Sequence, residues 1–222
     1  MTVSQKKSSR RENERQKRVE LILDAAERLF LEKGFTRTTM NDIGDAAEFG
    51  RATLYHYFPS KEAIYVAILE RAMDVLIKEA RDSVEGAKGA PNKIEKLKDT
   101  LLFFAQFREN FFHLYFITRS EVMPSLDRKL ANRLERKSKA FDDIFHDIYR
   151  EGVKRGELKR ADPLAMGDIF FAQIMGLMLL NSTETLEPPL AQNVNQATEF
   201  FLENIIAGPK KSRTMKKRGK QR

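Results

Sequence analysis

The sequence contains no cysteine. Disulfide frameworks, thiol nucleophiles and thiolate metal sites are therefore excluded, and a reducing cytoplasm is the compartment that we expect. Apolar runs are short as well, because residues 169–180 are interrupted by Gln173 and fall short of the about 20 residues that span a bilayer. The first residues carry charges with no apolar stretch behind them, so we expect neither a signal peptide nor a membrane segment.

Residue groups typical of catalysis are also missing. The histidines His56, His113 and His146 lie far apart and have no partner at metal-ligand spacing. The sequence has no glycine-rich phosphate loop and no serine elbow, and the adjacent acids Asp142 and Asp143 would point about 100° apart on a helix. We therefore expect no enzyme, no catalytic residues, no metal and no cofactor.

Positive charge is concentrated at the two ends of the chain. Residues 1–18 carry seven Lys or Arg and two Glu, and residues 208–222 carry eight Lys or Arg and no acid. Residues 19–207 are therefore net acidic, although the whole chain has a formal charge of +8. We expect residues 1–15 and 208–222 to be disordered basic segments that attract a polyanion, with solubility alone as the alternative.

The most informative stretch is residues 34–63, which predicts two short helices around a tight turn and the start of a third. Thr39 is a good N-cap, and Asp42 three residues later favours a helix over residues 40–47. A second helix is expected over residues 51–58, where Pro59 ends it. Ser60 would cap a third helix that begins at Lys61.

The second of these helices has an unusual outer face. At 3.6 residues per turn, Leu54 and Phe58 share the inner face, whereas the remaining side chains are small, hydroxylated or aromatic instead of Lys and Glu. Such side chains allow close approach to a partner and hydrogen bonds to phosphates or base edges. Lys61 lies at the positive end of its helix dipole, and a nearby DNA phosphate would explain its charge there.

The pattern T-x-x-D-I-x-x-x-A, followed by T-L-Y-x-Y-F-x-S-K-E-A, at positions 39–63 resembles the N-terminal domain of TetR-family transcriptional regulators. The chain departs from that family at Glu48, where a turn glycine is usual, and at Gly50, where a serine cap is usual. The resemblance implies an all-α protein with a three-helix helix-turn-helix domain and a larger helical domain for ligand binding and dimerisation. It implies DNA contacts by Thr38, Thr39, Arg51, Ala52, Thr53, Tyr55, His56, Tyr57 and Lys61. We expect Arg51, Ala52, Thr53 and His56 to approach bases, and Thr39, Tyr55, Tyr57 and Lys61 to hold phosphates.

Helical periodicity continues through the rest of the chain, with helices expected over residues 16–33, 61–84, 93–107, 124–155, 163–181 and 190–207. Seven aromatic residues between positions 103 and 116 predict either a packed core or the wall of a pocket for an apolar or aromatic small molecule. The candidate ligand-binding residues are Phe104, Phe107, Phe111, His113, Phe116, Phe171, Met175 and Met178.

The two closing helices would expose much apolar surface in a monomer, the last one through a stripe that includes Val194, Phe200 and Phe201. We interpret them as a homodimer interface, which the TetR resemblance also implies. The expected segments are a basic arm at 1–15, a DNA-binding domain at 16–60, a ligand-binding and dimerisation domain at 61–207 and a basic tail at 208–222.

The sequence thus predicts a cytoplasmic homodimeric repressor that binds an inverted repeat in double-stranded DNA and responds to a small-molecule effector. One alternative is a DNA-binding protein that coats DNA without sequence preference and without ligand control. Another is a scaffold protein that has lost contact with DNA, which the intact outer face at residues 52–57 disfavours.

Overall fold

The computed structural model describes residues 3–86, 118–183 and 189–207, together with Leu114, Thr185 and Glu187. These residues form helices joined by short turns, and their extended backbone is limited to an isolated bridge between Leu158 and Ile206. The prediction of an all-α fold is confirmed. The expected helix at 93–107 and the basic tail at 208–222 lie outside the described residues.

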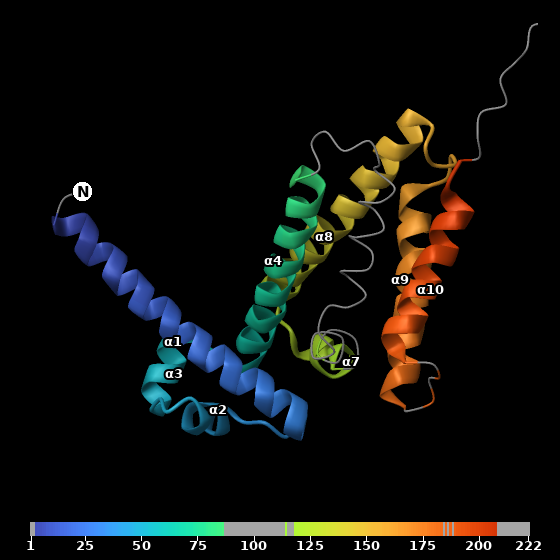
Figure 1. The fold of residues 1–222 in the computed structure, drawn as a ribbon. Coiled ribbons are helices and arrows are strands. Elements are labelled where there is room, and N and C mark those ends of the chain that lie inside the picture. The colour runs from blue at the N-terminus through green and yellow to red at the C-terminus, as the bar shows by residue number, and fades with distance from the viewer. Residues whose placement is uncertain are drawn as a thin grey trace, which may run out of the picture.

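The first three helices are α1 (Val3–Lys33), α2 (Met40–Ala46) and α3 (Arg51–Tyr57), which lie together at one end of the molecule (Figure 1). The prediction that residues 1–15 are disordered is wrong from Val3 onward, because α1 begins there. No proline or glycine interrupts residues 3–33, and extending an existing helix costs far less than nucleating one. Pairs four residues apart, such as Arg10 with Glu14 and Gln16 with Glu20, support the added turns.

Helix α4 (Lys61–Gly86) connects this end of the molecule to the remainder. A single hydrophobic core includes buried residues of α1, Leu54 of α3 and the first half of α4, and it extends to Leu130 and Leu134 of α8 (Arg128–Arg155). The three-helix unit therefore shares its core with the following helices. The division at residue 60 stays a prediction.

The segment before α8 differs from the expectation. After the short helix α7 (Arg119–Val122), Pro124 and Ser125 belong to the 3-10 turn η2 (Met123–Ser125) and do not open the long helix. Helix α8 begins at Arg128 because the side chain of Asp127 accepts a hydrogen bond from the backbone N–H of Leu130 (2.8 Å). Asp127, and not Pro124, is the start signal.

Two glycines shape the end of α8. Gly156 has a φ of 74°, in the left-handed region, and ends the helix. Gly152 lies inside the last turn, where a Cβ atom would come within 2.6 Å of a Leu158 side-chain carbon. The chain therefore turns sharply and brings residues 157–159 beside the end of α10 (Leu190–Ile205), where the Lys159 N–H donates to the Ile205 carbonyl (2.8 Å).

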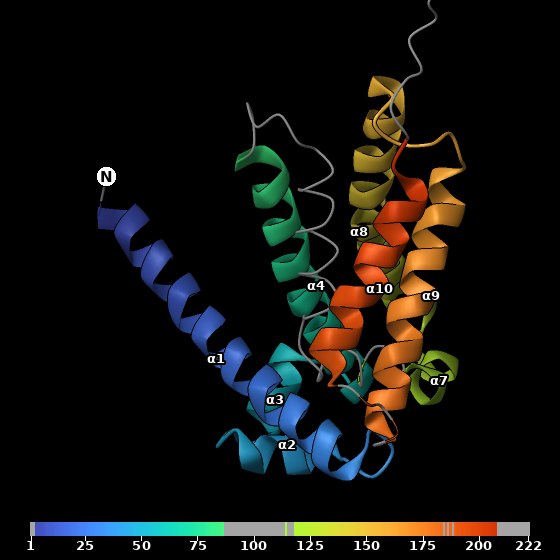
Figure 2. The ribbon, with the colours of Figure 1, turned by 45° about the vertical axis from the view of Figure 1, so that its right-hand side comes forward.

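Helix α9 (Pro163–Ser182) begins with the predicted pair of Asp162 as N-cap and Pro163 in the first turn. It packs along α10 on the far side of α8, as the two side views show (Figures 1 and 2). Helix α10 ends at Ile205, two residues before the predicted end, because Ile206 pairs with Leu158 and the Ala207 N–H donates to the Glu157 carbonyl.

These two closing helices leave large apolar side chains on the surface. Phe200 of α10 is 62% exposed, so it does not join the buried stripe formed by Val194, Phe201 and Ile205. On α9 the exposed apolar side chains are Leu164, Ile169, Leu179 and Leu180. By length and composition alone, residues 163–181 would suffice to cross a membrane, contrary to the expectation that no segment is long and apolar enough. Core helices of soluble proteins share these properties.

Candidate nucleic-acid interface

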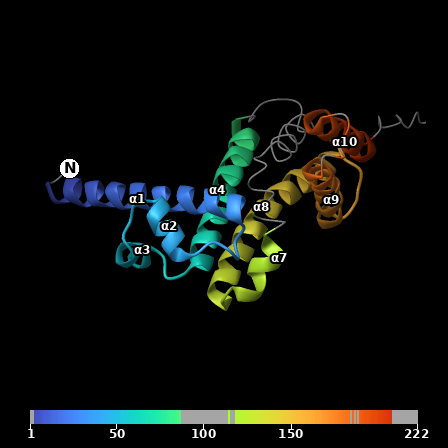
Figure 3. The same cartoon turned by 90° about the horizontal axis from the view of Figure 1, so that it is seen from below.

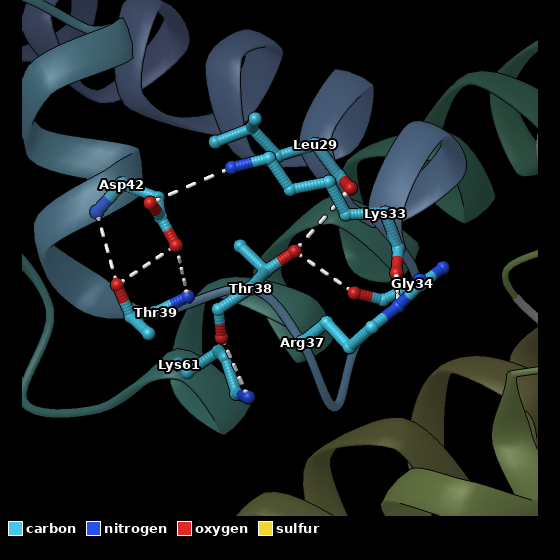
Figure 4. Close-up of polar contacts among 8 residues, drawn as sticks. All are labelled: Leu29, Lys33, Gly34, Arg37, Thr38, Thr39, Asp42 and Lys61. Atoms are coloured by element: carbon cyan, nitrogen blue, oxygen red, sulfur yellow. Dashed lines mark hydrogen bonds and ion pairs between the residues drawn. The ribbon is translucent and has the colours of Figure 1, made fainter.

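The start of α2 is fixed by a reciprocal capping box, as the sequence predicts. The Thr39 hydroxyl accepts from the Asp42 N–H (3.1 Å), and an Asp42 carboxylate oxygen accepts from the Thr39 N–H (2.8 Å). These bonds are visible in Figure 4, together with the ion pair between Lys33 and Asp42 at 3.5 Å. The bonds from Thr39, followed by Lys33, lower the pKa of the Asp42 carboxyl below its ordinary 3.8, so the carboxylate stays charged at neutral pH.

The turn between α2 and α3 is formed without the glycine that the TetR family usually has. Glu48 has a φ of 58°, which places a non-glycine residue in the left-handed region. The next residue, Phe49, donates its N–H to the Gly44 carbonyl (2.8 Å), and a Cβ atom on Gly44 would lie 2.9 Å from the Phe49 oxygen. The tight turn therefore requires glycine at position 44, inside α2, while a larger residue occupies the left-handed position.

Helix α3 is anchored by one face and exposes the other. Leu54 is fully buried in the core, whereas Arg51, Ala52, Tyr55 and His56 are exposed and Thr53 and Tyr57 are half-buried. The guanidinium of Arg51 lies 5.7 Å from the centre of the Tyr55 ring, and the rings of His56 and Tyr57 meet edge to face at 5.5 Å. Six of the nine candidate DNA-binding residues are thus gathered on this short helix.

Thr38 is not placed as the resemblance implies. Its side chain is 1% exposed, and its hydroxyl donates to the backbone carbonyl of Gly34 at 2.8 Å (Figure 4). A second contact joins the same hydroxyl to the Leu29 carbonyl at 3.3 Å. Its hydroxyl therefore satisfies the end of α1 and is unavailable to a DNA duplex, so the prediction that this side chain contacts DNA is corrected.

Lys61 also has a different role from the one that its position predicts. Its ammonium group donates to the carbonyls of Phe35 (2.7 Å) and Thr38 (2.8 Å), and the Thr36 carbonyl lies at 3.5 Å. The ammonium also lies 4.3 Å from the centre of the Phe35 ring. Burial lowers the pKa of Lys61 below its ordinary 10.5, against the opposing effect of Glu62. The charge at this helix start is explained by backbone carbonyls of the α1–α2 turn and does not require a phosphate.

Helix α4 forms ion pairs with helices on both of its sides, which the sequence did not reveal. Arg71 donates to Glu20 (2.8 Å), Asp24 (2.6 Å) and Glu27 (2.7 Å), all on α1. Hydrogen bonds to Glu20 and Asp24 raise the pKa of Arg71 although its partial burial opposes the rise. The spacing of the three acids on α1 is helical, but their common partner 44 to 51 residues away could not be read from the sequence.

On the other side, α4 is joined to α8. Glu70 accepts from Arg133 in a forked contact whose Nε to oxygen distance is 3.0 Å, and Asp74 pairs with Lys137. A further contact joins the α1–α2 turn to α7, where the Thr36 hydroxyl donates to Glu121 at 3.3 Å. Helix α4 is therefore bonded to the unit that carries α3 and to α8 at the same time.

Of the candidate ligand-binding residues, Phe104, Phe107, Phe111, His113 and Phe116 lie outside the described residues. The other three are on α9 but divide between two core clusters. Phe171 meets Phe141 of α8 edge to face at 5.8 Å and packs near α4, whereas Met175 and Met178 pack in the cluster with α10. Phe171 is thus the member that borders the space between α4, α8 and α9.

Comparison with known proteins places this geometry in context. Residues 22–68 match the family model for bacterial regulatory proteins of the tetR family. YfiR of Bacillus subtilis, an uncharacterised HTH-type transcriptional regulator, is 24% identical over 199 residues, or 88% of this chain and 95% of the relative. The HTH-type transcriptional repressor KstR2 of Mycobacterium tuberculosis is 28% identical over 137 residues, which are 61% of this chain and 66% of the repressor.

A solved structure shares the fold over nearly its whole length. The transcriptional regulator FadR from Bacillus subtilis, crystallised in complex with stearoyl-CoA, superposes with a TM-score of 0.69 and 20% identity. The superposition covers 84% of this chain and 98% of that chain. At this identity the likeness establishes the common fold, from the helix-turn-helix unit through the closing helices.

Proposed function

Because the chain belongs to the TetR family of bacterial regulatory proteins, we propose that it is a homodimeric transcriptional repressor of the bacterial cytoplasm that binds an inverted-repeat operator. The observation that carries this proposal is the outer face of α3. Its exposed side chains include a guanidinium, an imidazole, a phenol and a methyl group, on a helix whose opposite face is held by buried Leu54. Side chains of these kinds read base edges when their helix enters the major groove.

Within this interface, we assign base contacts to Arg51, Ala52, Thr53 and His56. Arg51 can form two bonds with guanine, and Ala52 can approach a thymine methyl group. Thr39, Tyr55 and Tyr57 are assigned to phosphates, because their hydroxyl groups lie at the edges of the same surface. Thr38 and Lys61 support the surface from within, through the carbonyl bonds at the end of α1.

The proposed dimer uses the exposed apolar face of α9 and α10. A second copy placed there would cover Phe200 and the exposed leucines of α9, and a two-fold axis would relate the two α3 helices. On an inverted repeat, these helices would enter successive major grooves about 34 Å apart.

Ligand control is the least constrained part of the proposal. FadR of Bacillus subtilis was crystallised with stearoyl-CoA, and by analogy we propose a small apolar or aromatic effector near Phe171. Such a ligand can weaken operator binding only if it prefers a conformation in which the two α3 helices have the wrong spacing. The bonds of α4 to both α1 and α8 would transmit such a change.

Selection of binding sites from a random duplex pool tests the function directly. We expect the parent protein to enrich an inverted repeat at near-physiological salt, and the double variant Arg51→Ala/His56→Ala to lose that enrichment. Arg28→Ala, which removes an exposed charge on α1 remote from α3, is the control and should enrich the same repeat. Binding by the parent that depends on salt but enriches no repeat would contradict the proposal and favour the DNA-coating alternative.

A further inference from the structure

The N-terminal part of α1 projects beyond the rest of the molecule. Core packing on α1 starts at Val19 and Ile22, and every described residue from Arg10 to Arg18 is exposed. In the side view the helix passes α3 and continues away from it, and the view from below shows the same projection (Figures 1 and 3). With a rise of 1.5 Å per residue, Arg10 lies about 18 Å along the helix axis from Ile22.

The basic residues of this projection are sorted by face. Arg11, Arg15 and Arg18 are spaced three and four residues apart and continue the stripe of Ile22, which faces the core. Arg10 and Lys17 lie on another side of the helix, where Arg10 is paired with Glu14 (3.1 Å). The stripe of three arginines is thus the direct continuation of the face that packs against the DNA-binding unit.

A contact joins this stripe to the candidate interface. The guanidinium of Arg15 lies 5.9 Å from the centre of the Tyr57 ring on α3. Its ion pair with Glu12 is long (3.9 Å) and exposed, so most of its positive charge is uncompensated. Arg15 therefore borders the same surface as the helix proposed to enter the major groove, with Arg11 one turn farther out.

We propose that residues 10–18 form a helical arm whose Arg11, Arg15 and Arg18 bind DNA phosphates flanking the half-site read by α3. The inference rests on the proposed function and extends it to DNA beyond the recognised bases. Double-stranded DNA fits this surface better than a membrane does, because residues 4–18 contain no apolar side chain to enter a lipid interface. A preformed helix also orders these arginines without the entropy cost of folding a disordered arm on binding.

Two double variants with the same change in charge separate the faces. Arg11→Gln/Arg15→Gln removes two arginines of the stripe, and Arg10→Gln/Lys17→Gln removes two cations from the other side of the same turns. Gln is a good helix former, and circular dichroism checks that helix content is unchanged. The probe is a duplex that carries the selected inverted repeat and extends about 10 bp, one helical turn, beyond each end. Its binding is measured as a function of salt.

We expect Arg11→Gln/Arg15→Gln to reduce the salt slope by about two, since each phosphate contact contributes about 0.9. The control should change the slope by less than half as much. On a duplex trimmed to the repeat itself, the difference between the two variants should disappear. Equal slopes for the two variants on the long duplex, or a difference that persists on the trimmed one, would overturn the inference. If the selection yields no repeat, the same measurement on random duplex still tests the arm separately from the repressor function.

Discussion

The ammonium group of Lys61 shows how one residue can carry a family pattern for a structural reason. The sequence suggests a phosphate contact, because a lysine at the start of a helix is disfavoured by the dipole. In the structure the same ammonium satisfies carbonyls at the end of the α1–α2 turn, which have no other donors in a helix ladder. The resulting bonds hold the start of α4 against the loop that precedes α2.

We therefore expect Lys61→Met to lower the free energy of unfolding by about 1–3 kcal/mol, since it leaves partly buried carbonyls without a donor. Chemical denaturation measures this loss. Lys33→Met, which removes a half-exposed ion pair at 3.5 Å nearby, is the control and should cost at most about 1 kcal/mol. The salt slope of DNA binding should stay that of the parent. A decrease of about one with unchanged stability would instead restore the phosphate role.

The glycines beside the α2–α3 turn are expected to respond in opposite ways. At Gly44 an added Cβ atom would press on the Phe49 backbone oxygen, so Gly44→Ala should destabilise the protein by about 1–3 kcal/mol. Gly50 is the N-cap of α3, has an extended φ of −61° and has open space around its Cα atom. Gly50→Ser should stabilise by a few tenths to about 1 kcal/mol, through a side-chain cap and reduced chain entropy. Thermal unfolding of both variants checks the contrast; destabilisation by Gly50→Ser would show that the cap site is not open.

At the scale of elements, α4 is the helix on which the two parts of the chain meet. Its first half belongs to the core shared with α1 and α3, and its polar side chains alternate between ion pairs to α1 and to α8. Arg71 is only 25% exposed and contacts three carboxylates, so its pairs are less screened than ordinary surface pairs.

Arg71→Met should destabilise the protein by about 1–2 kcal/mol, because it leaves three neighbouring carboxylates without their cation. The loss should shrink at high salt, which screens the repulsion among them. Lys78→Met removes an exposed pair with Asp82 on the same helix and should cost less than about 0.5 kcal/mol. Urea denaturation at low and high salt measures both. Equal effects of the two substitutions would mean that the Arg71 cluster does not join α4 to α1.

At the scale of the whole molecule, one chain leaves an apolar surface that water does not favour. The exposed residues of α9 and α10 come from two helices packed side by side, so they form one region of the surface (Figure 2). Contiguous apolar patches of this kind are typical of interfaces. Homodimerisation and DNA binding are thus linked in the proposed function, because an inverted repeat requires two copies of α3.

Phe200→Lys should convert the protein from dimer to monomer at micromolar concentration, since a charged side chain would be buried in the proposed interface. Sedimentation equilibrium measures the mass. Leu21→Lys places the same charge on an exposed apolar position of α1 and should leave the dimer intact. A parent protein that sediments as a monomer, or a Phe200→Lys variant that remains a dimer, would contradict an interface through this residue.

Sequence by itself determined the features that depend on neighbours along the chain. The capping box of α2 needs only Thr39 and Asp42, the stop of α3 is written in Pro59, and the helical class follows from periodicity. The motif at positions 39–63 was likewise sufficient to recognise the family. Local hydrogen bonds and propensities act over a few residues, which is why these features could be predicted.

Only the tertiary structure decided which side chains remain available for a partner. Thr38 and Lys61 belong to the recognised pattern but spend their polar groups on carbonyls at the end of α1 and in the following turn. Arg71 found its acids on a helix 44 to 51 residues earlier, and the basic arm became a helix because α1 continues without interruption. These outcomes depend on packing between segments distant in sequence, where a partner's identity is not encoded by local spacing.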